Sequence, residues 1–492
     1  NIYFLEFSGR YDGSSRFAAG HRWGFFPSFS AGYDIARTPY FQKMALPVSQ
    51  LKVRVSYGRL GNQNGAGLYD YIAQMPLDAQ GTNAWLLPGI SSSTASKGTI
   101  AQTPKMISPY ITWEKVDNAN LGFDLMLFKN RLSITADLYQ RTTRDMIGPA
   151  ESIPSISGIA SEDRAKVNNA TLRNRGWELS VSWNDKLKCG FSYGVGFNVF
   201  NYKAVVTKYN NPEGIIYNNH TGLAANKGYY EGMDLGEIWG YCADDLFLSN
   251  REIDDYLRKV NLTAFKSNDL WRRGDLKYID TNGDGRVDGG KGTLSDHGDL
   301  QVIGNTTPKY SFGINLNLGY KGFEVSTLLQ GVAKRDFPIA GSNYMFGGNN
   351  YNFKEHLDYF STENPNGYLP RLTGWKDDKD FLVNTGYNTT RYLLNAAYMR
   401  MKNLTVAYTF NKKQLKHIGI SNLKVYVTCD NLFTITKLPK QFDPETLNQV
   451  NMSAGGDAKN TAPGLTSPMK QNGNGMVYPM NRNFVFGLDF TF

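Results

Sequence analysis

The sequence has few residues of the kinds that build covalent or metal-bound cores. Only three cysteines, Cys189, Cys242 and Cys429, and only five histidines occur in 492 residues. Cysteines so few and so widely spaced do not predict a disulfide framework or a zinc site, and the histidines lack the spacing of metal ligands. The fold must therefore depend on packing, hydrogen bonding and its surroundings.

The sequence also lacks any run of about 18 apolar residues, which excludes membrane-spanning helices. Aromatic residues nevertheless make up 13% of the chain, glycine occurs 50 times, and the mean hydropathy is −0.42. Many aromatic residues in a chain that is hydrophilic on average are unusual for a large soluble core. The combination suits strands that are apolar on one face and polar on the other.

No block of like charge is present, although the formal net charge is +9. Lysine and arginine are spread along the chain, so the charge does not predict a nucleic-acid partner. A signal peptide is also missing at the start, where Asn1 opens directly on the strand-like NIYFLEFSGRYDG. We interpret the sequence as part of a longer protein whose N-terminal part is not included.

Alternation of apolar and polar residues is the dominant pattern, and it predicts about a dozen to fourteen strands. The segment 309–320, KYSFGINLNLGY, places Tyr310 and Tyr320 around four apolar residues on one face. Ten steps of about 3.3 Å give roughly 33 Å, or about 24 Å at a 45° tilt. This length matches the apolar band of an outer-membrane barrel with its aromatic girdles. The same alternation recurs at 51–57, 131–139, 177–183, 191–199, 404–410, 423–428 and 483–492.

The connections between these strands are of two kinds. Some are tight, as at Lys129-Asn130 and Lys321-Gly322, whereas others are long and polar. Short turns on one side and long loops on the other are typical of bacterial outer-membrane barrels. A series of soluble β-sandwiches or a propeller should instead show regular repeats, which the sequence lacks. The predicted long extracellular loops are about 60–110, 145–170, 207–305, 335–393 and 435–481.

Eight segments along the chain, taken together, identify a family. The segments 10–35, 51–64, 112–147, 174–183, 236–247, 274–288, 429–445 and 478–492 resemble, in order, SusC/RagA-type TonB-dependent transporters of Bacteroidetes. Each segment alone is a weak signal, but eight in the same order are specific. The resemblance spans residues 1–492 and implies the C-terminal 12 to 14 strands of a 22-stranded transmembrane β-barrel, without its plug domain.

The resemblance also implies a function and partners. Such proteins import oligosaccharides or oligopeptides across the bacterial outer membrane, with a SusD-like surface lipoprotein as a lid. TonB would couple import to the proton gradient through the N-terminal part, which would also supply the plug and the remaining strands. A dimer of SusC–SusD pairs, surrounded by outer-membrane lipid, is implied as well. The final Phe492 resembles the signal read by the barrel-assembly machinery, although it would also simply face lipid.

The segment 280–288, DTNGDGRVD, is the one motif with metal chemistry. Asp280, Asn282, Asp284 and Asp288 occupy positions 1, 3, 5 and 9 of an EF-hand-like loop, and Arg286 offers its carbonyl at position 7. Position 12 is Lys291 where a bidentate Glu is expected, and Asp296 or Asp299 would have to substitute. The pattern predicts a calcium brace; the alternative is a self-bonded turn without metal. No organic cofactor is expected.

Aromatic residues in the long polar loops are the candidates for ligand contact. Trp85, Tyr351 and Trp375 could stack on sugar rings or peptide side chains, although many loop aromatics only anchor their loop. No GxSxG, HExxH or P-loop motif occurs in a suitable context, so we expect no enzymatic activity. The alternatives to active import are a non-transporting glycan-binding or adhesive surface protein and a passive porin.

Overall fold

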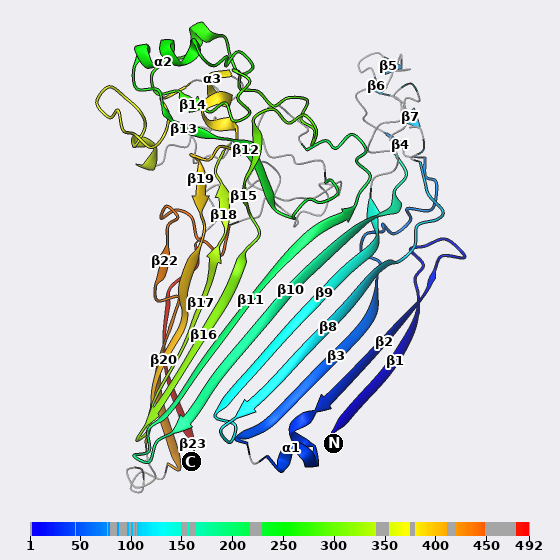
Figure 1. Ribbon diagram of the computed structural model, residues 1–492, viewed down its shortest axis with the longest axis vertical. Helices are drawn as coiled ribbons and strands as arrows, with labels where there is room; N and C mark the ends of the chain where they lie inside the picture. Colours follow the sequence, from blue (N-terminus) through cyan, green and yellow to red (C-terminus); the bar gives the residue numbers. More distant parts are fainter. Residues whose placement is uncertain are drawn as a thin grey trace.

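The computed structural model describes residues 2–44, 46–75, 106–148, 164–216, 229–340, 354–373, 379–410, 420–447 and 479–491, with a few residues between them. Within these residues one antiparallel sheet of 13 strands dominates (Figure 1). Its order is β1-β2-β3-β8-β9-β10-β11-β16-β17-β20-β21-β23, and β22 pairs with β20. The strands are β1 (Tyr3–Gly13), β2 (Trp23–Asp34), β3 (Val48–Asn62), β8 (Glu114–Leu127), β9 (Leu132–Gly148), β10 (Val167–Lys186), β11 (Ser192–Lys208), β16 (Lys309–Tyr320), β17 (Phe323–Lys334), β20 (Tyr398–Phe410), β21 (Asn422–Asp430), β22 (Thr434–Thr436) and β23 (Asn483–Thr491).

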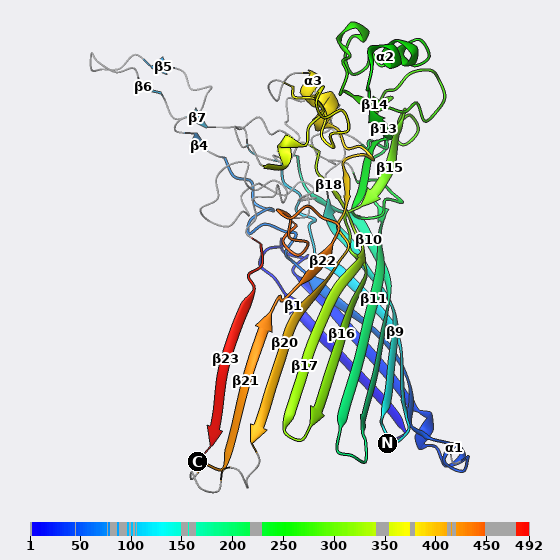
Figure 2. The ribbon, with the colours of Figure 1, turned by 90° about the vertical axis from the view of Figure 1, so that its left-hand side faces the viewer.

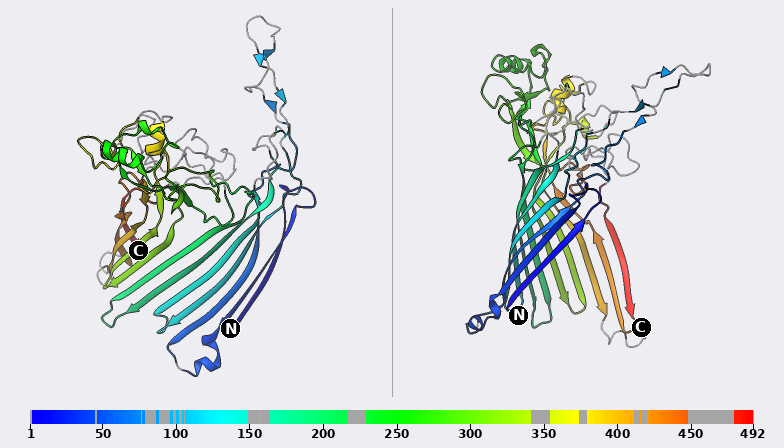
Figure 3. Two further views of the ribbon diagram at one scale, coloured as in Figure 1. Left: turned by 45° about the horizontal axis from the view of Figure 1, so that its top comes forward. Right: turned by 90° about the vertical axis from the view of Figure 1, so that its right-hand side faces the viewer.

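The sheet curves into an open shell with β1 at one edge and β23 at the other (Figures 2 and 3). From β1 to β23 the strands of this sheet lie in their order along the chain, except that β22 pairs with β20, and every pairing is antiparallel. The predicted all-β fold and the expected number of strands are therefore confirmed. No described helix is long and apolar enough to cross a membrane.

In the described part of the chain, the connections at the two ends of the sheet differ in length. At the lower end in Figure 1, β16 and β17 are joined only by Lys321 and Gly322, with φ angles of 47° and 92°. A two-residue hairpin turn with positive φ at both residues matches the twist of the flanking strands, and such a turn favours glycine at its second residue. A Cβ on Gly322 would also lie 2.6 Å from the Thr409 carbonyl oxygen.

The long connections gather at the upper end in Figure 1, where smaller elements lie. For example, the connection predicted at about 145–170 runs from the end of β9 at Gly148 to the start of β10 at Val167. The smaller elements are η1 (Ile35–Arg37), α1 (Pro39–Gln42), β4 (Leu77–Asp78), β5 (Leu86–Leu87), β6 (Ser96–Lys97), β7 (Ile100–Ala101), β12 (Glu237–Tyr241), β13 (Ala243–Leu246), α2 (Asn250–Leu257), η4 (Asn268–Leu270), β14 (Leu276–Tyr278), β15 (Leu300–Asn305), β18 (Asp336–Pro338), η5 (Lys354–Leu357), α3 (Lys379–Phe381), η6 (Leu382–Gly386) and β19 (Leu393–Asn395). Of these, η1 and α1 lie at the lower end, between β2 and β3.

The two faces of the sheet differ in chemistry, because the side chains of each strand alternate between them. On β10, Trp177, Leu179, Val181 and Trp183 share one face, and their partners on β9 are Leu138, Ala136, Ile134 and Leu132. On β23, Phe484, Phe486, Leu488 and Phe490 have 53–78% of their surface exposed. We name this the apolar face; so much exposed aromatic surface requires an apolar cover, and lipid provides one.

The two faces make opposite predictions for an introduced charge. Val181 lies on the apolar face between Phe197 and Ile134, whereas Ser180 lies on the polar face between Asn198 and Thr135. In the full-length protein, Val181→Arg should cost about 2 to 4 kcal/mol, because arginine would enter hydrocarbon. Ser180→Arg is the matched control and should change stability little. Unfolding in lipid vesicles measures both, and equal losses would contradict lipid as the cover.

Candidate functional site

Three of the long connections at the upper end fold into one body, which we call the loop module. It consists of the described parts of 229–308, 335–397 and 438–447 and has its own buried core. Phe265 and Tyr278 stack with ring centroids 4.4 Å apart, and the Tyr387 ring lies 5.4 Å from that of Phe265. Because Tyr387 belongs to the second of these connections, the aromatic contacts join two loops that are distant in sequence. The sequence analysis described these stretches only as long polar loops.

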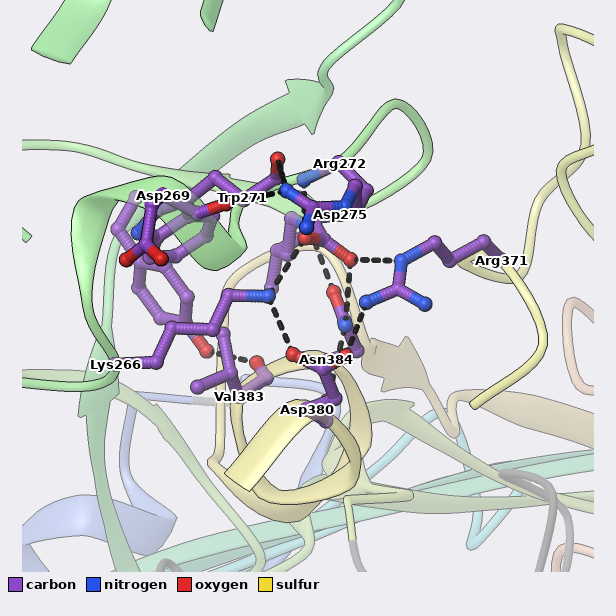
Figure 4. Close-up of polar contacts among 11 residues, drawn as sticks. Lys266, Asp269, Trp271, Arg272, Asp275, Arg371, Asp380, Val383 and Asn384 are labelled. Carbon is purple, nitrogen blue, oxygen red and sulfur yellow. Dashed lines mark hydrogen bonds and ion pairs between the residues drawn. The ribbon is translucent and has the colours of Figure 1, made fainter. Parts of the chain in front are cut away.

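A buried ion cluster also joins the first two connections (Figure 4). The side chains of Lys266 and Asp275 are 0% exposed, and Lys266 Nζ lies 2.7 Å from both Asp275 Oδ2 and Asp380 Oδ1. Arg371 Nε lies 2.5 Å from Asp275 Oδ1, and Arg371 Nη2 lies 2.5 Å from Asp380 Oδ2. Two cations thus face two carboxylates, so the cluster is neutral and each charge has a partner.

Neutral hydrogen bonds complete this cluster. Asn384 donates its amide to Asp275 Oδ1 at 2.9 Å and accepts the backbone N–H of Leu276 at 2.9 Å. The Lys266 ammonium also lies 4.6 Å from the ring centre of Trp271. Burial acts to raise the pKa of the Asp380 carboxyl, but hydrogen bonds from Lys266 and Arg371 outweigh it and hold that pKa below its usual value. The carboxylate therefore stays charged at neutral pH.

A second set of contacts fixes the loop module to the sheet. Arg400 on β20 lies 2.7 Å from Asp443 Oδ2, and both side chains are almost fully buried. Arg335 donates to the carbonyl oxygens of Thr306 at 3.1 Å and Pro444 at 3.2 Å. These bonds connect three loops at the upper end of the strands, so the module has a defined position on the sheet.

The segment 280–288 folds as a tight loop at the surface of the module. The Asp280 carboxylate accepts the backbone N–H groups of Gly283 at 2.6 Å and Gly285 at 2.8 Å, while the guanidinium of Arg286 lies 3.0 Å from Asp288 Oδ2. The buried carboxylate of Asp299 accepts the backbone N–H of Thr281 at 2.7 Å and of Asp288 at 3.0 Å. Asp299 thus braces the loop from inside.

Calcium at this loop stays a prediction. Among the residues that the structure describes, no three His, Cys, Asp or Glu side chains gather as a metal site. The oxygens of Asn282 and Asp284 accept the backbone N–H groups of Asp284 and Arg286, both at 2.9 Å, as a self-bonded turn would require. These bonds lie within the loop and use the same side-chain oxygens that the calcium motif would offer to the ion.

The polar face of the sheet is the second part of the candidate site. Arg54 on β3 donates to Asp124 at 2.7 Å and lies 3.3 Å from Asp137, so charges on three neighbouring strands form one network. Near the lower end, this face carries a groove of about 550 Å³. Polar residues that line it include Asn184, Ser192, Asn317, Glu324, Thr405 and Lys424. Apolar side chains such as Leu318 and Val325 also line the groove, so it combines hydrogen-bonding groups with apolar surface.

The sequence-predicted contact residues are not tested by this geometry. Trp85, Tyr351, Trp375 and Phe492 lie outside the described residues. The buried ion cluster, in contrast, was missed by the sequence analysis. Lys266 and Asp380 are 114 residues apart, and no local motif marks either of them.

Removal of Lys266 should loosen the loop module. In the full-length protein, Lys266→Met leaves the buried carboxylate of Asp275 and the partly exposed carboxylate of Asp380 with one cation, which should cost about 3 to 5 kcal/mol of module stability. Limited proteolysis with chymotrypsin, which cuts after the aromatic residues of this core, measures the effect. Lys259→Met is the matched control, because Lys259 is exposed on the same module. Equal cleavage of the two variants, with the barrel intact, would contradict the role of the cluster.

Comparisons with known proteins agree with this architecture. Residues 3–432 match the family described as TonB dependent receptor-like, beta-barrel. The chain is 25% identical over 498 residues to TonB-dependent receptor P3 of Formosa agariphila, covering all of this chain and 44% of the relative. It is 24% identical over 458 residues to TonB-dependent receptor SusC of Bacteroides thetaiotaomicron, covering 92% of this chain and 40% of the relative.

Solved structures share the fold. The RagAB peptide importer in its open-open state aligns with a TM-score of 0.69 and 21% identity, over all of this chain and 45% of that chain. Its closed-closed state aligns with a TM-score of 0.66 at the same identity and covers 46% of that chain. The chain thus spans less than half the length of the relatives it matches. Its 13-stranded sheet is part of a transmembrane barrel of the bacterial outer membrane, and the chain belongs to the TonB dependent receptor-like β-barrel family.

Proposed function

We propose that this chain forms part of the wall of an active importer for oligosaccharides or oligopeptides in the outer membrane. The family match over residues 3–432 carries the proposal, since it identifies a TonB-dependent receptor barrel. The polar inner face, with its Arg54–Asp124 network and the groove near Lys424, supports it, because a hydrated wall suits the passage of polar cargo. This role involves no covalent chemistry by the chain.

The partners of the importer are part of the same proposal. A plug, a TonB-contacting segment and the remaining strands would come from outside this sequence. A SusD-like lipoprotein would act as the lid, and two such pairs would form a dimer. The similarity to SusC and to the RagAB peptide importer supports this assignment, and the second of these names favours peptide as one candidate cargo beside oligosaccharide.

The loop module suits the proposed lid as a docking surface, because a buried core and a buried ion cluster hold its loops in one arrangement. Its core includes the fully buried Tyr278, and its ion cluster is centred on the fully buried Lys266 and Asp275. A preorganised surface loses little conformational entropy on binding. We therefore place the lid contact on the module and the cargo between the module and the inner face.

Active import differs from its two rivals in its need for energy. Bacteria that carry the full-length transporter and its lipoprotein should stop taking up labelled cargo when the proton gradient is collapsed, while surface binding persists. Uptake assays with and without a protonophore measure this, and a small porin-permeant solute is the control. Unchanged uptake after collapse would indicate a passive porin, and binding without uptake in energised cells would indicate an adhesive protein.

We also propose that the loop 280–288 binds Ca²⁺ as a brace. Asp280, Asn282 and Asp284 supply oxygen ligands at alternating positions, as calcium prefers. The Arg286 guanidinium lies 3.5 Å from Asp284 and 3.0 Å from Asp288, so calcium would have to displace it from these two carboxylates.

Calcium should therefore protect this loop from cleavage. In the full-length protein, millimolar calcium should slow proteolysis of the module, because the ion would join the two ends of the loop. Asp280→Asn combined with Asp284→Asn should abolish that protection. The exposed Asp269→Asn is the matched control and should retain it. Cleavage that does not change with calcium in the unsubstituted protein would rule out the site.

A further inference from the structure

The sequence of the last strand does not by itself fix how that strand pairs. Among the described strands, β23 pairs with β21 alone and forms one edge of the sheet (Figure 2). A slip of one residue would turn its apolar row, Phe484, Phe486, Leu488 and Phe490, to the polar face. A slip of two residues would only replace each apolar side chain by the next one. Other contacts must therefore select the register.

The polar face of β23 contains a glycine that selects one register. Gly487 lies directly opposite Tyr426 on β21, and a Cβ at Gly487 would overlap the Tyr426 ring. In the two registers that are slipped by two residues, Tyr426 would face Val485 or Asp489 instead. Either side chain would collide with the ring, so the observed register is the one in which the ring has room.

A charged pair on the same face favours the same register. Lys424 on β21 faces Asp489, and opposite charges on directly opposed residues stabilise a sheet. The slipped registers would place Gly487 or Thr491 opposite Lys424 and remove this pairing. The pair alone is a weak constraint, because Lys424 also lies 2.6 Å from Glu324 on β17.

A contact from the loop module holds the start of β23. The Asp443 carboxylate accepts the backbone N–H of Met480 at 3.1 Å, and the same oxygen lies 2.7 Å from the Arg400 guanidinium on β20. Asn431 donates its side-chain amide to the carbonyl oxygen of Asn481 at 2.8 Å. A slip of two residues would move Met480 by about 7 Å along the strand, which is beyond the reach of both bonds.

The Asp443 carboxylate is almost fully buried and stays charged at neutral pH. Burial acts to raise its pKa, but hydrogen bonds from Arg400 and from the backbone N–H groups of Glu445 and Met480 outweigh it and hold that pKa below its usual value. A charged carboxylate accepts a backbone N–H more strongly than a neutral group does. Because Arg400 belongs to β20, the start of β23 is tied to a strand two places away in the sheet.

We propose that Asp443, Tyr426 and Gly487 form a register lock, which sets where the last strand joins the sheet. Asp443 holds the loop end of β23, and Gly487 fixes its middle by admitting the Tyr426 ring. A barrel in lipid has no free edge, so the outer edge of β23 must pair as well. A slip of two residues would be passed on to that pairing. The lock goes beyond the proposed import and does not depend on the cargo.

Disulfide cross-linking between β21 and β23 measures the register. The full-length protein is used, with its other cysteines replaced by serine. Asn483→Cys combined with Asp430→Cys reports the observed register, in which these two residues face each other. Asn483→Cys combined with Thr428→Cys reports a slip of two residues toward the turns. Only directly opposed residues come close enough for a disulfide bond to form readily.

A transplanted glycine tests the lock. The test variant combines Asp443→Ala with Val485→Gly and Gly487→Val, which removes the anchor and moves the glycine by two residues. Cross-linking should shift from the native pair to the slipped pair, because the Tyr426 ring then has room only opposite residue 485. The glycine exchange without Asp443→Ala should keep the native cross-link, since Met480 stays anchored.

The matched control joins the glycine exchange to Asp255→Ala, which removes an exposed carboxylate of the loop module, and it should keep the native cross-link. Heat-modifiable mobility in electrophoresis identifies folded barrels, and only these are scored. Asp443→Asn keeps the shape of the side chain and loses its charge, so it replaces Asp443→Ala if the first variant does not fold. A native cross-link in the folded test variant, or a slipped cross-link in the control or with the exchange alone, would overturn the proposal.

Discussion

Removal of one face of a sheet from water is the constraint on which the rest of this structure depends. Lipid offers no hydrogen bonds, so every backbone N–H and C=O within it must pair with a neighbouring strand. Antiparallel pairing from β1 to β23 meets this demand across the shell. The same pairing fixes the register, and a shift of one residue would exchange the two faces. The chemistry of both faces follows from that register.

The register also explains why charge is distributed so unevenly. On the polar face, charges such as Arg54 and Asp137 lie in the middle of the strands and bond to each other across strands. On the apolar face, charges occur only beyond the level of Trp177 or near the turns.

The loop module is stabilised differently, because it lies outside the lipid and needs a buried hydrophobic core of its own. Buried aromatic and aliphatic side chains supply that core, and the cluster around Lys266 fixes how two long connections meet. Replacing buried ion pairs by apolar residues often costs nothing in stability, so their use here favours one specific arrangement. A defined arrangement is what a docking surface above a transport path requires.

The sequence by itself determined the strands, their faces and the family. Alternation in 309–320 marks β16 from end to end, and the tight turn at Lys321-Gly322 is equally local, because both depend on neighbouring residues. Only the tertiary structure decided the loop module and which charged residues of different strands lie side by side. Lys266 meets Asp380 across 114 residues, and Arg175 lies beside Lys203 through strand pairing. Such contacts depend on how distant segments pack and pair, and the alternation of residues within one segment does not predict them.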